Sequence, residues 1–170
     1  MIANDIIQML ESKAPKIWYH GSDNPDITKF KTSATSFALL GKGVYFYKDK
    51  KATKKYGKFT YKVSLPNYIK ILPLGFKFSD SQIEGLSQDH ALDFDRFDIT
   101  KRFGGARLPI WWVTEGYKFI GKKRDFVAQK MASFIKIMVG VSGMMADYPN
   151  GGVVLCLWDQ YTELESELIF

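Results

Sequence analysis

Hydrophobic and polar residues alternate along residues 59–65, where aromatic and aliphatic side chains are separated by Thr, Lys and Ser. Alternation with a period of two predicts a strand with one buried face. Residues 68–72 are expected to form a second strand, or a continuation of the first past a bulge. Residues 153–158 are an uninterrupted apolar run and predict a third strand, which follows turn-forming clusters in residues 144–152.

Apolar residues recur at helical spacing elsewhere. Residues 123–139 predict a helix of about four turns that ends near Gly140. Its apolar positions, at intervals of three and four, are Phe126, Val127, Met131, Phe134, Ile135 and Met138. Residues 2–10 predict a short amphipathic helix that Pro15 closes, and a further short helix is expected around residues 80–92.

The composition is that of a folded protein: 46% of the 170 residues are hydrophobic, and no run of about 18 uncharged apolar residues occurs. One domain over residues 1–170 is expected from this length. No signal peptide is recognised at the amino terminus, so we expect a soluble, cytoplasmic protein with no membrane contact. Cys156, the single cysteine, lies in the apolar run and is expected to be a buried, inert thiol.

The net charge is +6, and part of it is concentrated between residues 48 and 62. The simplest interpretation is a solvated basic surface. The alternatives are attraction of the phosphates of a dinucleotide, or of an acidic macromolecular target. The basic residues of this segment are Lys48, Lys50, Lys51, Lys54, Lys55, Lys58 and Lys62.

Two segments carry candidate chemistry. Residues 16–22 end in His20-Gly21-Ser22 and predict a strand that runs into a glycine turn, and a Gly-Val-Tyr-Phe sequence follows at residues 43–46. These residue types suit one reaction in particular, the cleavage of the bond between nicotinamide and ribose. That reaction requires aromatic faces that stack on the nicotinamide ring, hydrogen bonds to the carboxamide and the ribose, and a carboxylate that stabilises the developing cation. The simplest alternative is that Tyr45 and its neighbours are strand core and that His20 is a turn residue.

The order and spacing of these segments resemble the nicotinamide-binding signature of the ADP-ribosyltransferase superfamily. The branch is the His-Tyr-Glu one, which includes poly(ADP-ribose) polymerases and diphtheria toxin. The resemblance covers residues 17–57, and residues 126–158 more weakly. It implies an α+β fold in which two small, roughly orthogonal antiparallel sheets form an NAD cleft with flanking helices, one of them after Tyr45.

The resemblance also implies roles for individual residues. His20 would contact the ribose, and Gly21, with Ser22 beside it, would hold the carboxamide through its backbone. Tyr45 and Tyr56, eleven residues apart, would sandwich the nicotinamide, with Thr53 bonded to its amide. The cofactor is NAD+, consumed as a substrate. No metal is expected, since His90 with Asp93 and Asp95 is more simply solvated surface.

The third element of the family pattern, a glutamate near the start of a late apolar strand, is missing from residues 152–158. Asp147 is the first candidate to replace it as a catalytic carboxylate beside His20 and Tyr45. Its neighbourhood resembles the late acidic turn of a phage anti-CRISPR member of the family, although an ordinary turn-former before Tyr148 is an equal alternative. Gln160, Glu163 and Glu165 follow the strand and would have to fold back.

The sequence therefore predicts a mono-ADP-ribosyltransferase of phage or bacterial effector type, toxin-like, that transfers ADP-ribose from NAD+ to a macromolecule. A protein acceptor is preferred over a nucleic acid, and the site of action is the producing cell or the cytoplasm of a host cell. The alternative is a non-catalytic module that binds NAD+, ADP-ribose or a protein partner on the same fold. An RNA 2′-phosphotransferase is disfavoured, because the chain has only four arginines.

Overall fold

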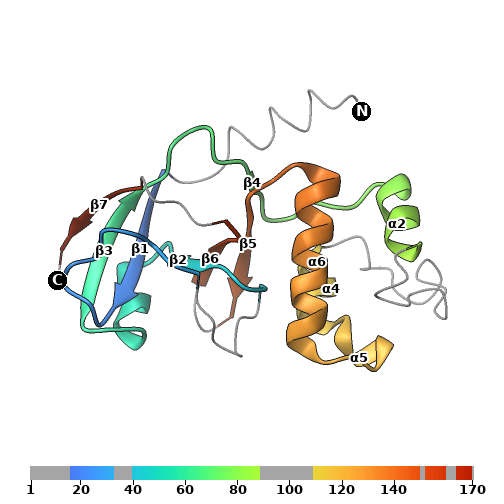
Figure 1. Ribbon diagram of the computed structural model, residues 1–170, viewed down its shortest axis with the longest axis horizontal. Coiled ribbons are helices and arrows are strands. Elements are labelled where there is room, and N and C mark those ends of the chain that lie inside the picture. The colour runs from blue at the N-terminus through green and yellow to red at the C-terminus, as the bar shows by residue number, and fades with distance from the viewer. Residues whose placement is uncertain (1–15, 33–39, 89–108, 150–151, 160–163, 170) are drawn as a thin grey trace. The chain divides into compact units, whose positions relative to one another are not determined.

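The computed structural model describes residues 16–32, 40–88, 109–149, 152–159 and 164–169. The strands are β1 (Ile17–Ser22), β2 (Val44–Tyr47), β3 (Phe59–Ser64), β4 (Ile71–Leu72), β5 (Gly143–Tyr148), β6 (Gly152–Leu157) and β7 (Glu165–Leu168). The helices are the 3₁₀ helix η1 (Lys50–Lys55) and the α-helices α2 (Asp80–Ser87), α4 (Pro109–Glu115), α5 (Tyr117–Ile120) and α6 (Arg124–Val139). The predicted α+β class is confirmed (Figure 1).

The strands form one sheet in the order β4-β5-β6-β2-β1-β3-β7. Every neighbouring pair is antiparallel except β4 and β5, which are parallel. The prediction of two separate sheets is therefore wrong, because β2 pairs with β6 on one side and with β1 on the other. The join between β1 and β2 is narrow, since their register contains a single pair, Tyr19↔Tyr47.

Contacts between residues divide the chain into two compact units. Unit 1 comprises residues 1–33, 43–74 and 141–170, and holds the sheet and η1. Unit 2 comprises residues 34–42 and 75–140, and holds α2, α4, α5 and α6. The single domain over residues 1–170 stays a prediction.

The core of unit 1 lies against one face of the sheet. Alternation along β3 buries Tyr61 and Val63, as the period-two pattern predicts. Trp18 of β1 and Phe46 of β2 are fully buried in the same cluster. The cluster also contains Phe30, Val44, Leu65, Ile69, Ile71, Met145, Leu155, Leu157 and Leu164.

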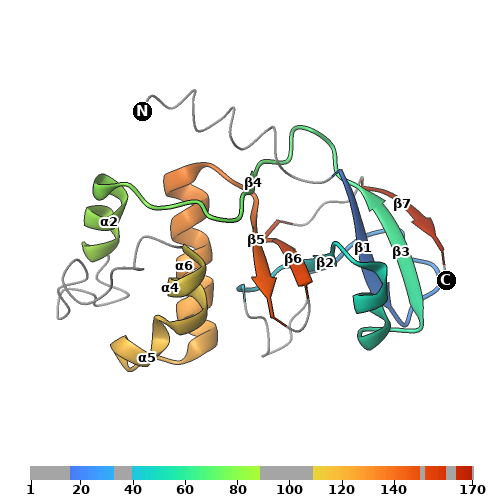
Figure 2. The ribbon, with the colours of Figure 1, turned by 180° about the vertical axis from the view of Figure 1, so that it is seen from behind.

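The opposite face of the sheet carries η1, which Figure 2 shows beside β1 and β3. This short helix begins after Asp49, whose carboxylate accepts a hydrogen bond from the Lys51 amide. It corresponds to the helix that the resemblance implies after Tyr45. Thr53 is the buried residue of this helix, and its side chain is fully covered.

In unit 2, α6 confirms the helix expected over residues 123–139. Its buried residues include Met131 and Ile135, and Gly140 ends it in the left-handed conformation at a φ of 74°. Phe126 and Met138 were expected on the buried face but are exposed. Both sit near the ends of the helix, where fewer neighbours cover it. None of the helices within the described ranges is long and apolar enough to span a membrane.

Two further segments differ from the sequence expectation. Turn-forming clusters were expected within residues 144–152, but the first part of this segment belongs to β5, which is hydrogen-bonded between β4 and β6. The helix expected around residues 80–92 is α2, which starts with a capping box between Ser79 and Gln82. The expected amino-terminal helix and the triplet His90, Asp93 and Asp95 lie outside the described residues.

Candidate functional site

The backbone of Gly21 points away from β3. In antiparallel pairs, hydrogen-bonded and non-hydrogen-bonded positions alternate. The Leu65 amide donates to the Lys16 carbonyl at 2.9 Å, so these two residues form a hydrogen-bonded pair between the segments of β1 and β3. Gly21 lies five positions further along, and the alternation therefore places it in a non-hydrogen-bonded pair. Gly21 opposes Thr60, whose own carbonyl accepts from Ile169 on the β7 side at 2.9 Å. The N–H and C=O of Gly21 therefore both face the β2 side of β1.

Pairing with β2 stops just before this point. The recorded pair is Tyr19↔Tyr47. In the same register, the next pair of the same hydrogen-bonding type would be Gly21 with Tyr45, and this pair is absent from the β1–β2 ladder of the described strands. The carbonyl oxygen of Tyr45 accepts a hydrogen bond of 2.8 Å from Nδ1 of His20. The two strands thus present an open backbone edge at Gly21, with the imidazole of His20 fixed beside it.

The hydrogen bond to Tyr45 determines the tautomer of His20. A carbonyl oxygen only accepts, so the proton is on Nδ1 and Nε2 is an acceptor in the neutral ring. The ring packs against Phe30 and Phe46, with centroid separations of 5.2 and 5.6 Å. Burial lowers the pKa of His20 below its usual 6.5, against the smaller raising effect of the Tyr45 hydrogen bond. Near neutral pH, His20 can therefore accept a hydrogen bond from a hydroxyl group.

Tyr56 stacks on Tyr47. Their ring centroids are 4.7 Å apart and the rings are inclined by 16°, so the two rings are in contact. The resemblance implies Tyr45 as the partner of Tyr56 across the width of a heterocycle, and the structure instead places Tyr47 against Tyr56. Burial, with a hydrogen bond donated by the Tyr47 hydroxyl to Tyr56 as a smaller cause, raises the pKa of Tyr47. Tyr56 remains 55% exposed.

Tyr47 was missed at the sequence level, although a signal for it exists. It follows Tyr45 by two residues in β2, so strand alternation puts both side chains on the same face. Phe46 between them belongs to the core cluster, which places Tyr45 and Tyr47 on the opposite face with η1. His20 contacts Phe46 and so lies on the core face. The open edge at Gly21 lies between these two groups of side chains.

Thr53 is brought next to Gly21 by η1. Its hydroxyl donates to the Lys50 carbonyl at 2.6 Å and lies 2.8 Å from the Thr60 hydroxyl. A hydroxyl has one hydrogen, so Thr60 is the donor in the second bond and Thr53 keeps one free acceptor position. A Cβ at Gly21 would lie 2.5 Å from the Thr53 carbonyl oxygen and 3.2 Å from Tyr56 Cβ. Gly21, Thr53 and Tyr56 therefore come together, as the resemblance implies.

Ser22 has a structural role in the turn after β1. Its hydroxyl accepts a hydrogen bond of 3.0 Å from the Asn24 amide. Gly57 packs directly under it, because a Cβ at residue 57 would lie 2.1 Å from the Ser22 carbonyl carbon. The glycine after Tyr56 is thus explained by the close approach of two backbone segments.

The candidate carboxylates lie apart from His20. Asp147 is exposed on β5, opposite Val153. β6 and β2 lie between β5 and β1, so three strand spacings, about 14 Å, separate the strands that carry Asp147 and His20. Glu165 is exposed on the outer strand β7, opposite Ser64. Gln160 and Glu163 lie outside the described residues.

Cys156 is buried, as expected, and takes part in no disulfide. Burial raises its pKa to about 12, against a smaller lowering effect of a hydrogen bond with the Tyr45 side chain. A thiol with this pKa is fully protonated near neutral pH and is a poor nucleophile. As for metals, the part of the chain that the structure describes has no cluster of three His, Cys, Asp or Glu side chains able to hold an ion.

Comparison with known proteins yields no family. No family model matches the chain, and no curated protein does. A solved structure, described as the crystal structure of an anti-CRISPR protein, is similar at 15% sequence identity and a TM-score of 0.48. The similarity covers 93% of this chain and 98% of that one. At this identity and TM-score, it assigns neither a family nor an activity to this chain.

Proposed function

We propose that this protein is an NAD+-dependent mono-ADP-ribosyltransferase that modifies a macromolecular acceptor. The observation that carries the proposal is the open edge at Gly21, where one backbone N–H and one C=O face away from β3 beside a fixed imidazole. A primary carboxamide is the complement of such an edge, because it has one carbonyl acceptor and an N–H donor side by side. The nicotinamide of NAD+ carries this group.

The neighbouring side chains fit the rest of the substrate. Thr53 has an acceptor position available for the second carboxamide N–H, although its burial requires η1 to shift slightly. Tyr47 covers one face of Tyr56, and the exposed face of Tyr56 can stack on the nicotinamide ring. Nε2 of His20 would accept a hydrogen bond from a ribose hydroxyl. A ligand that lies across the edge between β1 and β2 can reach both the ring of Tyr56 and the imidazole of His20.

The finer fold that we propose is an ADP-ribosyltransferase-like one. Its support is the narrow join at Tyr19↔Tyr47, which nearly divides the single sheet into a β4-β5-β6-β2 part and a β1-β3-β7 part.

In the proposed transfer of ADP-ribose, the C–N bond between the ribose and nicotinamide breaks, and the nicotinamide leaves with the electron pair. An acceptor nucleophile then bonds to the ribose carbon and loses its proton.

The electrostatic part of catalysis needs a carboxylate near the developing cation. Asp147 remains our first candidate, which requires that the bound substrate extend from His20 toward β5. Replacing Asp147 with Asn should then lower turnover about 10²- to 10³-fold, by comparison with other charge-stabilising groups, with the affinity for NAD+ almost unchanged. Retained turnover would move the role to Glu163 or Glu165.

The test of the site is NAD+ binding by calorimetry, together with nicotinamide release and intact-mass analysis of acceptors in a cell lysate. Tyr56→Ala should weaken NAD+ binding about tenfold or more, from the loss of one stacking face. The matched control is Tyr68→Ala, since Tyr68 is also exposed, at 67%, but lies outside the site. An unchanged affinity in Tyr56→Ala, or an equal loss in both variants, would overturn the assignment.

The second candidate is a non-catalytic module that binds NAD+ or ADP-ribose through the same edge. Two observations favour it: β6 carries no acidic residue, and Asp147 lies three strands from β1. Wild-type protein that binds NAD+ in the calorimeter, yet releases no nicotinamide and leaves every lysate protein at its original mass, would establish this function in place of transfer.

A further inference from the structure

Residues 48–62 account for the entire net charge of the protein. They contain seven lysines and one aspartate, so their net charge of +6 equals that of all 170 residues. The other 155 residues hold as many acidic as basic side chains. The net positive charge of the protein therefore corresponds to one short segment of unit 1.

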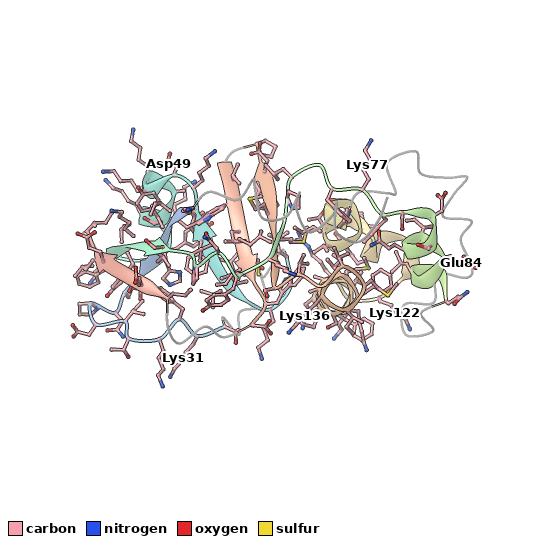
Figure 3. All side chains as sticks on the ribbon, turned by 90° about the horizontal axis from the view of Figure 1, so that it is seen from above. Lys31, Asp49, Lys77, Glu84, Lys122 and Lys136 are labelled. Atoms are coloured by element: carbon pink, nitrogen blue, oxygen red, sulfur yellow. The ribbon has the colours of Figure 1, made fainter. Side chains whose placement is uncertain are left out.

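This segment displays its charges to solvent. Six of the lysines are exposed, and we name them the lysine cluster: Lys48, Lys50, Lys51, Lys54, Lys55 and Lys58. Lys62 is not included in the cluster, because its Nζ forms an ion pair with Oε2 of Glu167 at 3.6 Å. The carboxylate of Asp49 caps η1, and in Figure 3 Asp49 is labelled at this helix, among outward-pointing side chains that end in nitrogen. With about 2 Å of rise per residue, the six residues of η1 extend over about 12 Å.

An exposed aromatic ring accompanies the charges. Tyr56 comes directly after Lys54 and Lys55 and before Lys58, and more than half of its surface is exposed. Its stack on Tyr47 holds the ring in place from one side. Lysine ammonium groups around a fixed, exposed aromatic face are the combination that single-stranded nucleic acids require, for their phosphates and bases respectively.

We propose that the lysine cluster binds single-stranded nucleic acid, with Tyr56 as a stacking platform. The composition of the cluster favours this partner over an acidic protein. Lysine is depleted at protein–protein interfaces and arginine is enriched there, whereas residues 48–62 contain seven lysines and no arginine. Phosphate contacts by lysine are independent of base sequence, so the binding is expected to be non-specific and strongly salt-dependent.

The experiment measures the fluorescence anisotropy of a labelled oligothymidylate of about 15 nucleotides, without NAD+, so that it stands apart from the proposed function. Six phosphate contacts predict a slope of about −4 in log K against log salt concentration on a single strand. The variant Lys51→Gln, Lys54→Gln, Lys55→Gln removes three exposed charges from η1. It should flatten the slope by about 2 and bind more weakly at every salt concentration.

The matched control removes three exposed lysines of unit 2 by Lys77→Gln, Lys122→Gln, Lys123→Gln, two of which are labelled in Figure 3. It changes the net charge equally and should leave the slope within about 0.5 of the wild-type value. Circular dichroism melting checks that both variants fold. An equal loss in the control, absence of binding at about 50 mM salt, or tighter binding of polyglutamate or phosphatidylserine vesicles than of the oligonucleotide would each overturn the proposal.

Discussion

Gly21 stands where the backbone of η1 approaches β1 most closely. A Cβ at this position would lie 2.5 Å from the Thr53 carbonyl oxygen, which real Cβ atoms do not approach. Gly21→Ala should therefore push η1 away from the sheet and lower the free energy of unfolding by about 1–3 kcal/mol. Urea denaturation followed by circular dichroism measures this loss.

Gly85 provides a matched control for the same substitution. It lies inside α2, where a new Cβ would meet Met138 Cε at 3.4 Å, an ordinary contact with a flexible side chain. Gly85→Ala should raise the free energy of unfolding by about 0.5–1 kcal/mol, because alanine is the better helix former. If both alanine variants changed stability in the same direction, the close approach at Gly21 would be disproved.

His20 makes stability depend on pH. Its pKa is lower in the folded protein than in the unfolded chain, mainly because the ring is buried. The neutral, buried ring therefore makes its full contribution to the free energy of unfolding above about pH 6.5. This contribution is lost as the pH falls from there toward the pKa of the folded state, because the unfolded chain takes up the proton first. The loss has a slope of at most about 1.4 kcal/mol per pH unit.

His20→Gln should remove this slope from the free energy of unfolding between about pH 7.5 and 5.5. Glutamine retains a donor for the Tyr45 carbonyl, so that the hydrogen bond is not the quantity tested. The control is the same substitution at His90, the other histidine of the chain. An identical pH dependence in wild type and His20→Gln would show that the ring does not titrate differently on folding.

At the scale of elements, η1 is attached to β3 through the buried hydroxyl pair of Thr53 and Thr60. Thr53→Val leaves the Thr60 hydroxyl and the Lys50 carbonyl without this partner, which should cost about 1–3 kcal/mol. Thr60→Val removes only one bond, because Thr53 still donates to Lys50, and should cost about 1 kcal/mol.

The double variant distinguishes a coupled pair from two independent contacts. Once Thr53 is valine, the second substitution removes a hydroxyl that is already unpaired, so the double variant should be no less stable than Thr53→Val alone. The coupling energy in this double-mutant cycle should fall between about 0.5 and 3 kcal/mol. Strict additivity of the two losses would contradict the hydrogen bond between Thr53 and Thr60.

At the scale of the whole molecule, neither compact unit is a continuous stretch of chain. Unit 1 is assembled from three segments and unit 2 from two, so the chain crosses between them four times. We therefore predict one cooperative unfolding transition, in which tryptophan fluorescence and far-ultraviolet circular dichroism coincide. Met131→Ala on the buried face of α6 should lower the free energy of unfolding by about 2–5 kcal/mol and shift the transitions seen by both probes together. Two separated transitions would contradict the expectation of a single domain.

The sequence by itself determined the features that depend on neighbouring residues. Helix α6 begins within one residue of its expected start, because the three-and-four spacing of its apolar residues specifies a buried stripe. Strands β3 and β6 were recognisable from alternation and from an apolar run. Gly21, Thr53 and Tyr56 are close in space, and their shared role in binding stays a prediction.

Only the tertiary structure decided features that depend on distant partners. The sheet is single because Tyr19 pairs with Tyr47, and no local pattern specifies such a pair. β5 is a strand because β4 and β6 complete its backbone hydrogen bonds, which overrides the turn preferences of its sequence. Tyr47, rather than Tyr45, contacts Tyr56, and no local pattern specifies which of the two tyrosines makes this contact. Periodicity is encoded in adjacent residues, whereas register and contact across a sheet are fixed by packing of the whole chain.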